Sequence, residues 1–524
     1  MAIKLNKEES VFRNELIFAV DTKGITIDHT MVNLYMLLKF NGQRPKQRAR
    51  KGGSALIKID HLKKVLENLE VDGTLHGYSK NPEAAEPWIR SNLVNMVFRG
   101  KVEKEKISSL RPIHLESYRV RNAQITRDYF SADQVYLMLG ANPTVKEDLK
   151  NFLMEGWDPT TDKINISENL DVDSLGLLHV VKGINPGFLE SSSSLNKISP
   201  LLYKQADLYC DDVRRLLVYK SLIPRNVLID YFKTITSFHL ALYSQRLVFL
   251  LPKMISEGKI EVEDDWNIVV DATDSFDSNI ARISSNEAAN LTNNLYDYVK
   301  ATFQINATLR RLKLDKNSSE NLVQALKALK NKNDKFEMYF EIKWDTLYSS
   351  LDEEDKLLVN DLVKYEDTFF EKYIELILKV RGRYIYKFGV QMLDALAQKN
   401  SERGFMSQGR SKKHPRRFVM GTRLLETLVQ ILVLKADGDH FITRSLSIEE
   451  LMNQIRDRYG LIINGLSEER FKDADINTHI AFKENVEAFK QRLRQIGFYN
   501  DLSDAYILQK IRPRYELNTM ENDN

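Results

Sequence analysis

Three aspartates follow a short apolar run near the middle of the chain. Residues 268–270 are apolar, Asp271 comes next, and Asp274 and Asp277 lie in the loop that follows. An apolar strand that ends in an aspartate, with further carboxylates in the next loop, is how many Mg²⁺ sites begin, because hard cations take oxygen ligands. The same residue types are also common in turns and helix caps, and their spacing fits no complete metal motif. A structural role is the favoured interpretation, and a Mg²⁺-dependent nuclease or phosphotransferase is the alternative, which requires the three carboxylates to converge.

A second group of side chains with chemical potential is basic and lies near the C-terminus. Residues 403–425 contain seven Lys or Arg and no Asp or Glu. Lysine and arginine bind the phosphates of nucleic-acid backbones, and further cations lie on the last helix that we predict and just after it. The predicted nucleic-acid contacts are Arg410, Lys412, Lys413, Arg416, Arg417, Lys483, Lys490, Arg494, Arg512 and Arg514.

The elements that would position these cations form a predicted winged-helix-like module over residues 401–517. A helix over 422–435 is apolar nearly all round and should be buried. Ser447 and Glu450 have the spacing of a capping box, which predicts that a second helix begins there.

A third helix is predicted over residues 480–496, followed by two strands, 498–502 and 505–511, that would form the wing. The loop before the third helix, about 18 residues long, departs from a simple helix-turn-helix. In a winged helix the third helix would enter a major groove, and the basic loop would follow the phosphates. Packing of the same surfaces against another protein is the alternative.

The whole chain is predicted to be mainly α, multidomain, with a small α/β part at the N-terminus. Residues 16–27 read as two short strands, and residues 44–51 form a basic loop that is either a solvated linker or a phosphate-contacting arm. The predicted units are a mixed α/β domain over 1–115, a small helical unit over 116–190, a helical body over 195–400, the basic module over 401–517 and a disordered tail over 518–524.

Little in the sequence indicates a cofactor or a metal. His239 lies beside the apolar stripe of a long helix and has no second histidine four residues later, so we interpret it as structural. Cys210 is the sole cysteine, which excludes a disulfide within the chain and a cysteine-based zinc site. We predict no cofactor and no metal ion, and the balance of these features favours a non-catalytic protein over an enzyme.

Composition and charge limit the possible partners. The formal net charge is only +3, so nucleic-acid binding would depend on local patches rather than on bulk charge. The first residues carry charges throughout, unlike a signal peptide, and no run approaches the roughly 18 apolar residues that a membrane span needs. We therefore expect a cytoplasmic protein without a membrane partner.

The run HPRRFVMGTRLLETLVQILVL, the later run RLRQIGFYNDLSDAYILQKIRPRYEL and the helical stretch VYKSLIPRNVLIDYFKTITSFHLALYSQRL resemble accessory proteins of bacterial anti-phage islands. The resemblance is to a component of the methylation-associated defence system and covers much of residues 120–517. It implies methyltransferase and ATPase subunits as neighbours and work on phage DNA, and it supplies no catalytic residues. We expect a DNA-contacting or scaffolding subunit that binds double-stranded DNA. A pure protein adaptor and the Mg²⁺-dependent enzyme are the alternatives.

Overall fold

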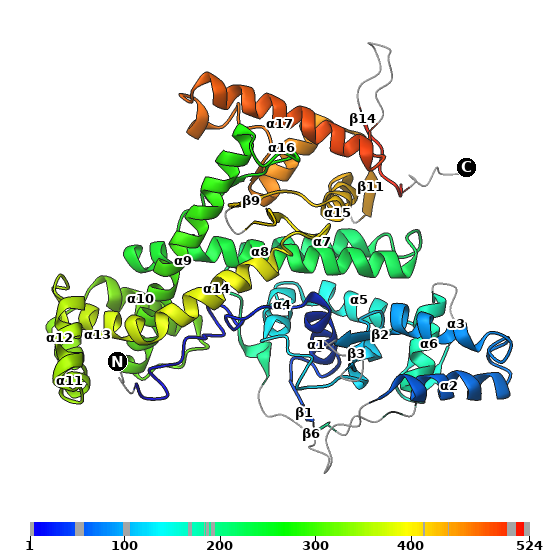
Figure 1. Cartoon of the computed structure of the whole chain (residues 1–524), viewed down its shortest axis with the longest axis horizontal. Coiled ribbons are helices and arrows are strands. Elements are labelled where there is room, and N and C mark those ends of the chain that lie inside the picture. The colour runs from blue at the N-terminus through cyan, green and yellow to red at the C-terminus, as the bar shows by residue number, and fades with distance from the viewer. Residues whose placement is uncertain are drawn as a thin grey trace.

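The computed structural model describes residues 5–47, 57–97, 105–165, 170–182, 184, 188–189, 194–411, 414–438, 440–499 and 510–517. Helices make up most of the regular structure, which confirms the mainly α prediction, and the described strands pair in two-stranded sheets. Two long helices, α8 (Arg225–Glu257) and α9 (Asn279–Leu312), pack against each other in the middle of the molecule (Figure 1).

The central helix α8 is buried on nearly all sides, as its sequence requires. Pro224, directly before the helix, has the fixed φ that suits a helix start, and Gly258 ends it in the left-handed conformation with φ +71°. Hydrophobic side chains recur around the whole circumference rather than on one stripe, which is typical of a helix in the core of a large protein.

The N-terminal part wraps one side of α8 with short helices and hairpins. Several of its elements share a small second core, which includes Leu62, Leu110, Trp157 and Leu177, whereas α1, α4 and α5 join the main core. The elements are α1 (Ile27–Lys39), β1 (Lys46–Gln47), α2 (Ile59–Val71), α3 (Pro82–Trp88), η1 (Ile89–Leu93), β2 (Val94–Val97), β3 (Lys106–Leu110), η3 (Leu115–Arg119), α4 (Ser131–Leu139), α5 (Pro143–Met154), β4 (Trp157–Asp158), β5 (Lys163–Ile164), α6 (Val172–Val181), β6 (Phe188–Leu189) and η4 (Leu195–Lys197).

The prediction of two strands over residues 16–27 is wrong. The segment is irregular up to Thr26, and Ile27 already begins α1. Its backbone groups bond to side chains and loops instead of a neighbouring strand: the Ala19 N–H donates to the side chain of Gln134, and the Asp21 N–H donates to the carbonyl of Tyr129. The apolar run that suggested a strand is buried on all sides against helices, so burial rather than pairing explains its composition.

The helical body continues on both sides of α8 and α9 and ends in a group of helices at one end of the molecule (Figure 1). A π-helical turn joins α13 directly to α14, so the two form one continuous helix that changes its pitch there. The elements are α7 (Tyr203–Leu217), β7 (Ile268–Val269), α10 (Ser319–Lys330), α11 (Asp334–Ser349), α12 (Glu353–Leu362), α13 (Phe369–Ile377), η5 (Leu378–Gly382) and α14 (Arg383–Leu396).

The C-terminal elements contain the three predicted helices. The first is buried as predicted, and the capping box of Ser447 with Glu450 is present at the start of the second. The third begins four residues earlier than predicted, because Asp475 accepts a hydrogen bond from the Thr478 N–H and caps it there. The elements are β8 (Met406–Gln408), β9 (Arg416–Phe418), α15 (Thr422–Leu432), β10 (Leu434–Asp437), β11 (His440–Thr443), β12 (Leu446–Ser447), α16 (Ile448–Tyr459), β13 (Leu461–Ile462), η6 (Glu469–Phe471), α17 (Ile476–Gln495) and β14 (Lys510–Ile511).

Most of the predicted wing falls within residues 500–509, which lie outside the described residues. Its described end, β14, pairs with β12 in an antiparallel sheet. The long loop between α16 and α17 contains β13, which pairs in parallel with β7 of the helical body. Side chains of the C-terminal elements and of the helical body also share one core. The winged helix itself stays a prediction.

Candidate nucleic-acid surface and a polar cavity

Asp271 and Arg417 form an ion pair inside the protein. The carboxylate of Asp271 is fully buried, Arg417 is 4% exposed, and Arg417 donates to Asp271 and to the carbonyl of Ser275. Asp271 also accepts hydrogen bonds from the backbone and side chain of Thr273, both at 2.7 Å. Burial raises the pKa of Asp271, and the hydrogen bonds and Arg417 oppose that shift. The pair joins the start of the loop after β7 to β9.

The three aspartates do not converge, which removes the geometric basis of the proposed Mg²⁺ site. Asp274 is turned outward and pairs with Arg492 (2.8 Å), and Asp277 is exposed. The described residues contain no group of three or more His, Cys, Asp or Glu that could hold a metal ion. The sequence could not show this, because Arg417 and Arg492 are far from the aspartates along the chain.

The predicted nucleic-acid contacts differ in how far they are already neutralised. Among those with carboxylate partners, Arg416 binds Asp394 through two hydrogen bonds (2.7 and 3.0 Å), and Arg417 is the buried partner of Asp271. Lys490 pairs with Glu487 on its own helix (2.6 Å). Each of these would have to leave a carboxylate to bind a phosphate.

The remaining predicted contacts that the structure describes lie at the surface or near it. Arg410, Lys483 and Arg512 are exposed. Arg514 is half exposed and pairs with Glu426 (2.8 Å), and the guanidinium of Arg494 lies 5.2 Å from the ring centre of Tyr499. Lys412 and Lys413 lie outside the described residues.

Arg44, at the start of the predicted basic loop, is a structural residue. It forms a two-pronged contact with Asp128 (2.8 and 2.9 Å) and also pairs with Asp133. Burial raises the pKa of Asp133 to about 6 even though Arg44 opposes the shift. The rest of the loop, residues 48–51, lies outside the described residues.

The π-helical turn η5 and the start of α14 carry a cationic surface that the sequence analysis did not identify. The 18 residues between Glu375 and Asp394 contain four Lys or Arg and no carboxylate. Lys379, Arg383 and Lys387 are exposed, and Tyr384 among them is 47% exposed. The absence of Asp and Glu could have revealed this surface, but the apolar stripe of the same segment suggested only a core helix.

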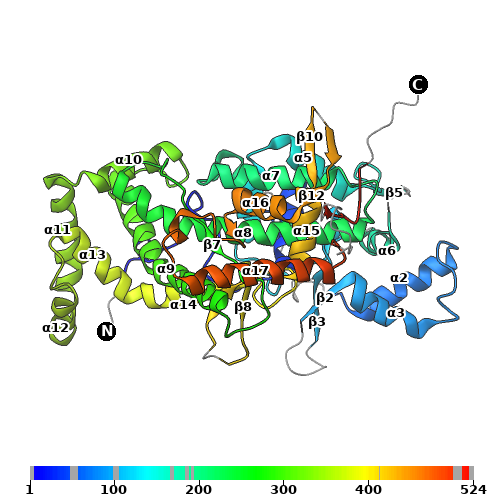
Figure 2. The same cartoon turned by 90° about the horizontal axis from the view of Figure 1, so that it is seen from above.

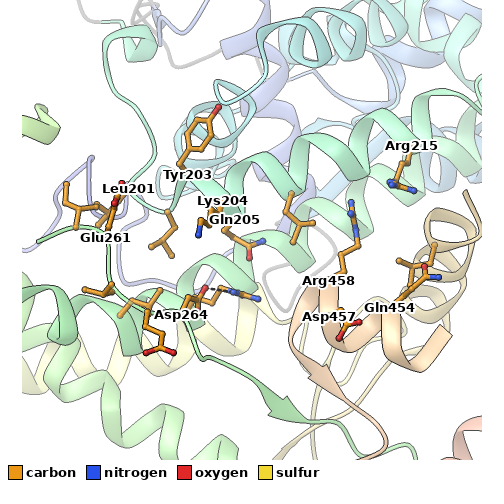
Figure 3. A pocket seen from close by; sticks show the side chains of 18 of the residues that line it. Leu201, Tyr203, Lys204, Gln205, Arg215, Glu261, Asp264, Gln454, Asp457 and Arg458 are labelled. Atoms are coloured by element: carbon orange, nitrogen blue, oxygen red, sulfur yellow. Dashed lines mark hydrogen bonds and ion pairs between the residues drawn. The ribbon is translucent and has the colours of Figure 1, made fainter. Parts of the chain in front are cut away.

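A cavity of about 1310 Å³ lies where α7 and α8 meet β10 and α16. Figure 3 shows its polar side chains, with Lys204, Gln205 and Arg215 coming from α7 and Gln454 and Arg458 from α16. Several residues of the segment 260–264 complete the lining. The sequence analysis missed this cavity because its walls come from segments about 250 residues apart.

A hydrogen-bond network is buried beside this cavity. The carboxylate of Asp212 accepts hydrogen bonds from His239 Nε2 and Tyr459 Oη, both at 2.8 Å. Arg458 Nε donates to the same carboxylate at 3.0 Å. Although burial alone favours the neutral acid, Arg458 and His239 hold the pKa of Asp212 below its ordinary value. Burial lowers the pKa of His239 despite the opposing effect of Asp212, so the imidazole is neutral.

The ionised Asp212 determines which nitrogen of His239 carries the proton. A carboxylate can only accept, so the proton is on His239 Nε2, and Nδ1 is left as an acceptor. Nδ1 therefore accepts the hydrogen bond from Gln205 Nε2 at 2.9 Å. The structural role predicted for His239 agrees with this position, because the ring is fully buried and both its nitrogens are bonded within the protein.

The fold and these surfaces define a class: a mainly helical protein with exposed cations around the start of α14, a polar cavity and, in its described part, no cluster of metal-binding side chains. A family model described as methylation-associated defense system protein MAD7 matches residues 7–515. The chain belongs to this family. Neither curated proteins nor solved structures give a match. Across the described residues, no helix has the length and apolar character needed to cross a membrane.

Proposed function

We propose that the protein is a non-catalytic, DNA-contacting subunit of a bacterial anti-phage defence complex and that it works in the cytoplasm. Membership of a defence-system family supports a role beside other defence proteins, and a methyltransferase and an ATPase are the proposed neighbours. The proposed DNA is double-stranded.

The observation that carries the DNA-contacting role is the arrangement of three cationic elements. Figure 2 shows α14, the β8–β9 hairpin and α17 along one side of the molecule. The exposed cations Lys387, Arg410 and Lys483 come from these three elements in turn. Phosphate contacts need cations that can leave water without leaving a carboxylate, and these three satisfy that condition better than the paired Arg416 and Arg417.

Duplex-DNA binding across a salt series tests this role. The triple variant Arg410→Glu, Lys483→Glu, Arg512→Glu should flatten the plot of log K against log salt by about 2.7, since each phosphate contact contributes about 0.9. Because the C-terminal residues share the core with the helical body, charge reversal is a cleaner test than truncation. Failure of the wild-type protein to bind duplex DNA at low salt would refute the proposal.

A scaffolding role has its own support at the far end of the helical body. Large apolar side chains are exposed on α11 and α12 and just after them: Met338, Ile342, Leu357, Leu358 and Tyr365, with exposed fractions from 59% to 85%. Monomeric proteins seldom leave several such side chains together in water, so this end favours contact with a protein. Ile342→Asp with Leu357→Asp should abolish binding of a partner defence subunit and leave DNA binding unchanged. Retained partner binding would exclude this surface.

A further inference from the structure

The cavity between α7 and α16 is an elongated groove. Gln205 and Arg215 both line it and are ten residues apart on α7, which corresponds to about 15 Å along a helix. The wall of the groove has an apolar stretch between its polar ends, formed by Leu208 of α7 and by Leu250 and Met254 of α8. A compact ion would occupy only a small part of such a length.

Three buried polar atoms of residues that line this groove have no hydrogen-bond partner among the described residues. One is Gln205 Oε1, whose side chain is 4% exposed; Nε2 of the same amide is held by His239, so the oxygen is the free acceptor. Figure 3 shows the Gln205 amide on the cavity wall between Lys204 and Arg458. The other two are Nε of Arg246 and Nε of Arg444, both donors. Unpaired buried groups of both kinds call for an occupant that can both donate and accept.

The two ends of the groove differ in charge. Arg215, Lys435 and Arg444, with one carboxylate, Asp457, line the side formed by α7, β10 and α16, whereas Glu261 and Glu263 line the side formed by the segment after α8, where Arg246 pairs with Asp264. An occupant that matches this polarity carries a negative charge at the β10 end and a positive charge at the other.

We propose that this groove binds an extended peptide segment of a partner protein, with an acidic residue at the end near β10. A peptide backbone offers N–H and C=O groups in alternation, so one segment can supply a donor to Gln205 Oε1 and an acceptor to Arg444 Nε. The length of about 15 Å corresponds to four or five extended residues. Apolar side chains of the segment would pack on Leu208, Leu250 and Met254. This site is separate from the proposed DNA-contacting surface.

The test selects short randomised peptides, displayed on phage, on the immobilised full-length protein. The variant Lys435→Glu, Arg444→Glu serves for counter-selection, and Lys327→Glu on α10 is the matched control. Enriched peptides should share an acidic residue and bind the wild type and the control alike. They should bind the double variant at least about tenfold more weakly, because a charge pair is lost. Replacing their acidic residue by lysine should restore binding to the double variant, which a misfolded protein could not show.

Gln205→Leu provides a second, independent variant, since it removes the acceptor without changing charge. It should weaken the selected peptides and leave duplex-DNA binding unchanged. Three outcomes would overturn the proposal. The first is that no peptide is enriched in a way that depends on Lys435 and Arg444. The second is that pyrophosphate alone raises the melting temperature of the wild type but not of the double variant, which assigns the groove to a small anion. The third is that the double variant loses duplex-DNA affinity, which assigns the groove to the DNA surface.

Discussion

The strand β9 and the helix α14 are joined by the pair Arg416–Asp394, and both carry arginines. The arginines of β9 are paired with carboxylates, whereas the arginine at the start of α14 has no carboxylate partner among the described residues. In β9, Arg417 points inward to Asp271 and Arg416 binds Asp394. Around the start of α14, Lys379, Arg383 and Lys387 are exposed on a segment without carboxylates. Local charge density is similar in the two stretches. What separates a cation that stabilises the fold from one that is available to a ligand is the partner that the fold brings to it, here from 146 residues away.

The largest effect should come from breaking the inward-facing pair. Arg417→Ala leaves the carboxylate of Asp271 buried without its cation, and removal of one partner of a buried pair costs about 3–5 kcal/mol. Urea unfolding measures this loss. The double variant Asp271→Leu, Arg417→Met should recover most of it, because no lone buried charge remains. Equal losses in the single and double variants would show that the pair is not the reason for the effect.

His114 extends the comparison of buried and exposed charged groups to a group that the fold keeps uncharged. His114 is buried, and burial lowers its pKa to about 3, well below the ordinary value of 6.5. Because the unfolded chain binds a proton at His114 below pH 6.5 and the folded protein does not, stability is full above that pH and falls as the pH drops toward 3. The loss from His114 should approach about 1.4 kcal/mol per pH unit. His114→Gln should remove this part of the slope in urea unfolding at pH 7.5, 6.5 and 5.5, and an unchanged slope would contradict it.

A smaller effect is expected for the neighbouring arginine in the same strand. Arg416 is partly exposed and its pair with Asp394 lies near the surface, so Arg416→Ala should cost about 0.2–1 kcal/mol. A loss of stability as large as that of Arg417→Ala would mean that the two arginines of β9 contribute equally to the fold, which would contradict the difference between the buried and the partly exposed pair.

Local rules predicted the helices more successfully than the contacts between distant segments. The capping box predicted for Ser447 and Glu450 is present, since it depends on a few adjacent residues. The pairing of β13 with β7, by contrast, joins residues nearly 200 positions apart, and no local pattern signals it.

For the candidate surfaces, too, the sequence showed local features but not contacts between distant segments. Sequence identified Arg410 and Lys483 as basic residues, and they are exposed, but it could not tell them from the buried Arg417. The groove and the unpaired Oε1 atom of Gln205 could be found only in the tertiary structure, because α7 and α16 meet only in the folded chain.

The central claim is that α14 carries cations that are free to contact DNA. The direct measurement is duplex-DNA affinity across a salt series for the variant Lys379→Glu, Arg383→Glu, Lys387→Glu. A charge-matched control reverses Lys327, Lys335 and Lys364, exposed cations on α10, on α11 and just after α12. The account predicts that the α14 variant lowers the salt slope by about 2.7 relative to wild type, with stability within about 0.5 kcal/mol, while the control keeps the wild-type slope. Equal slopes for wild type and the α14 variant would contradict it.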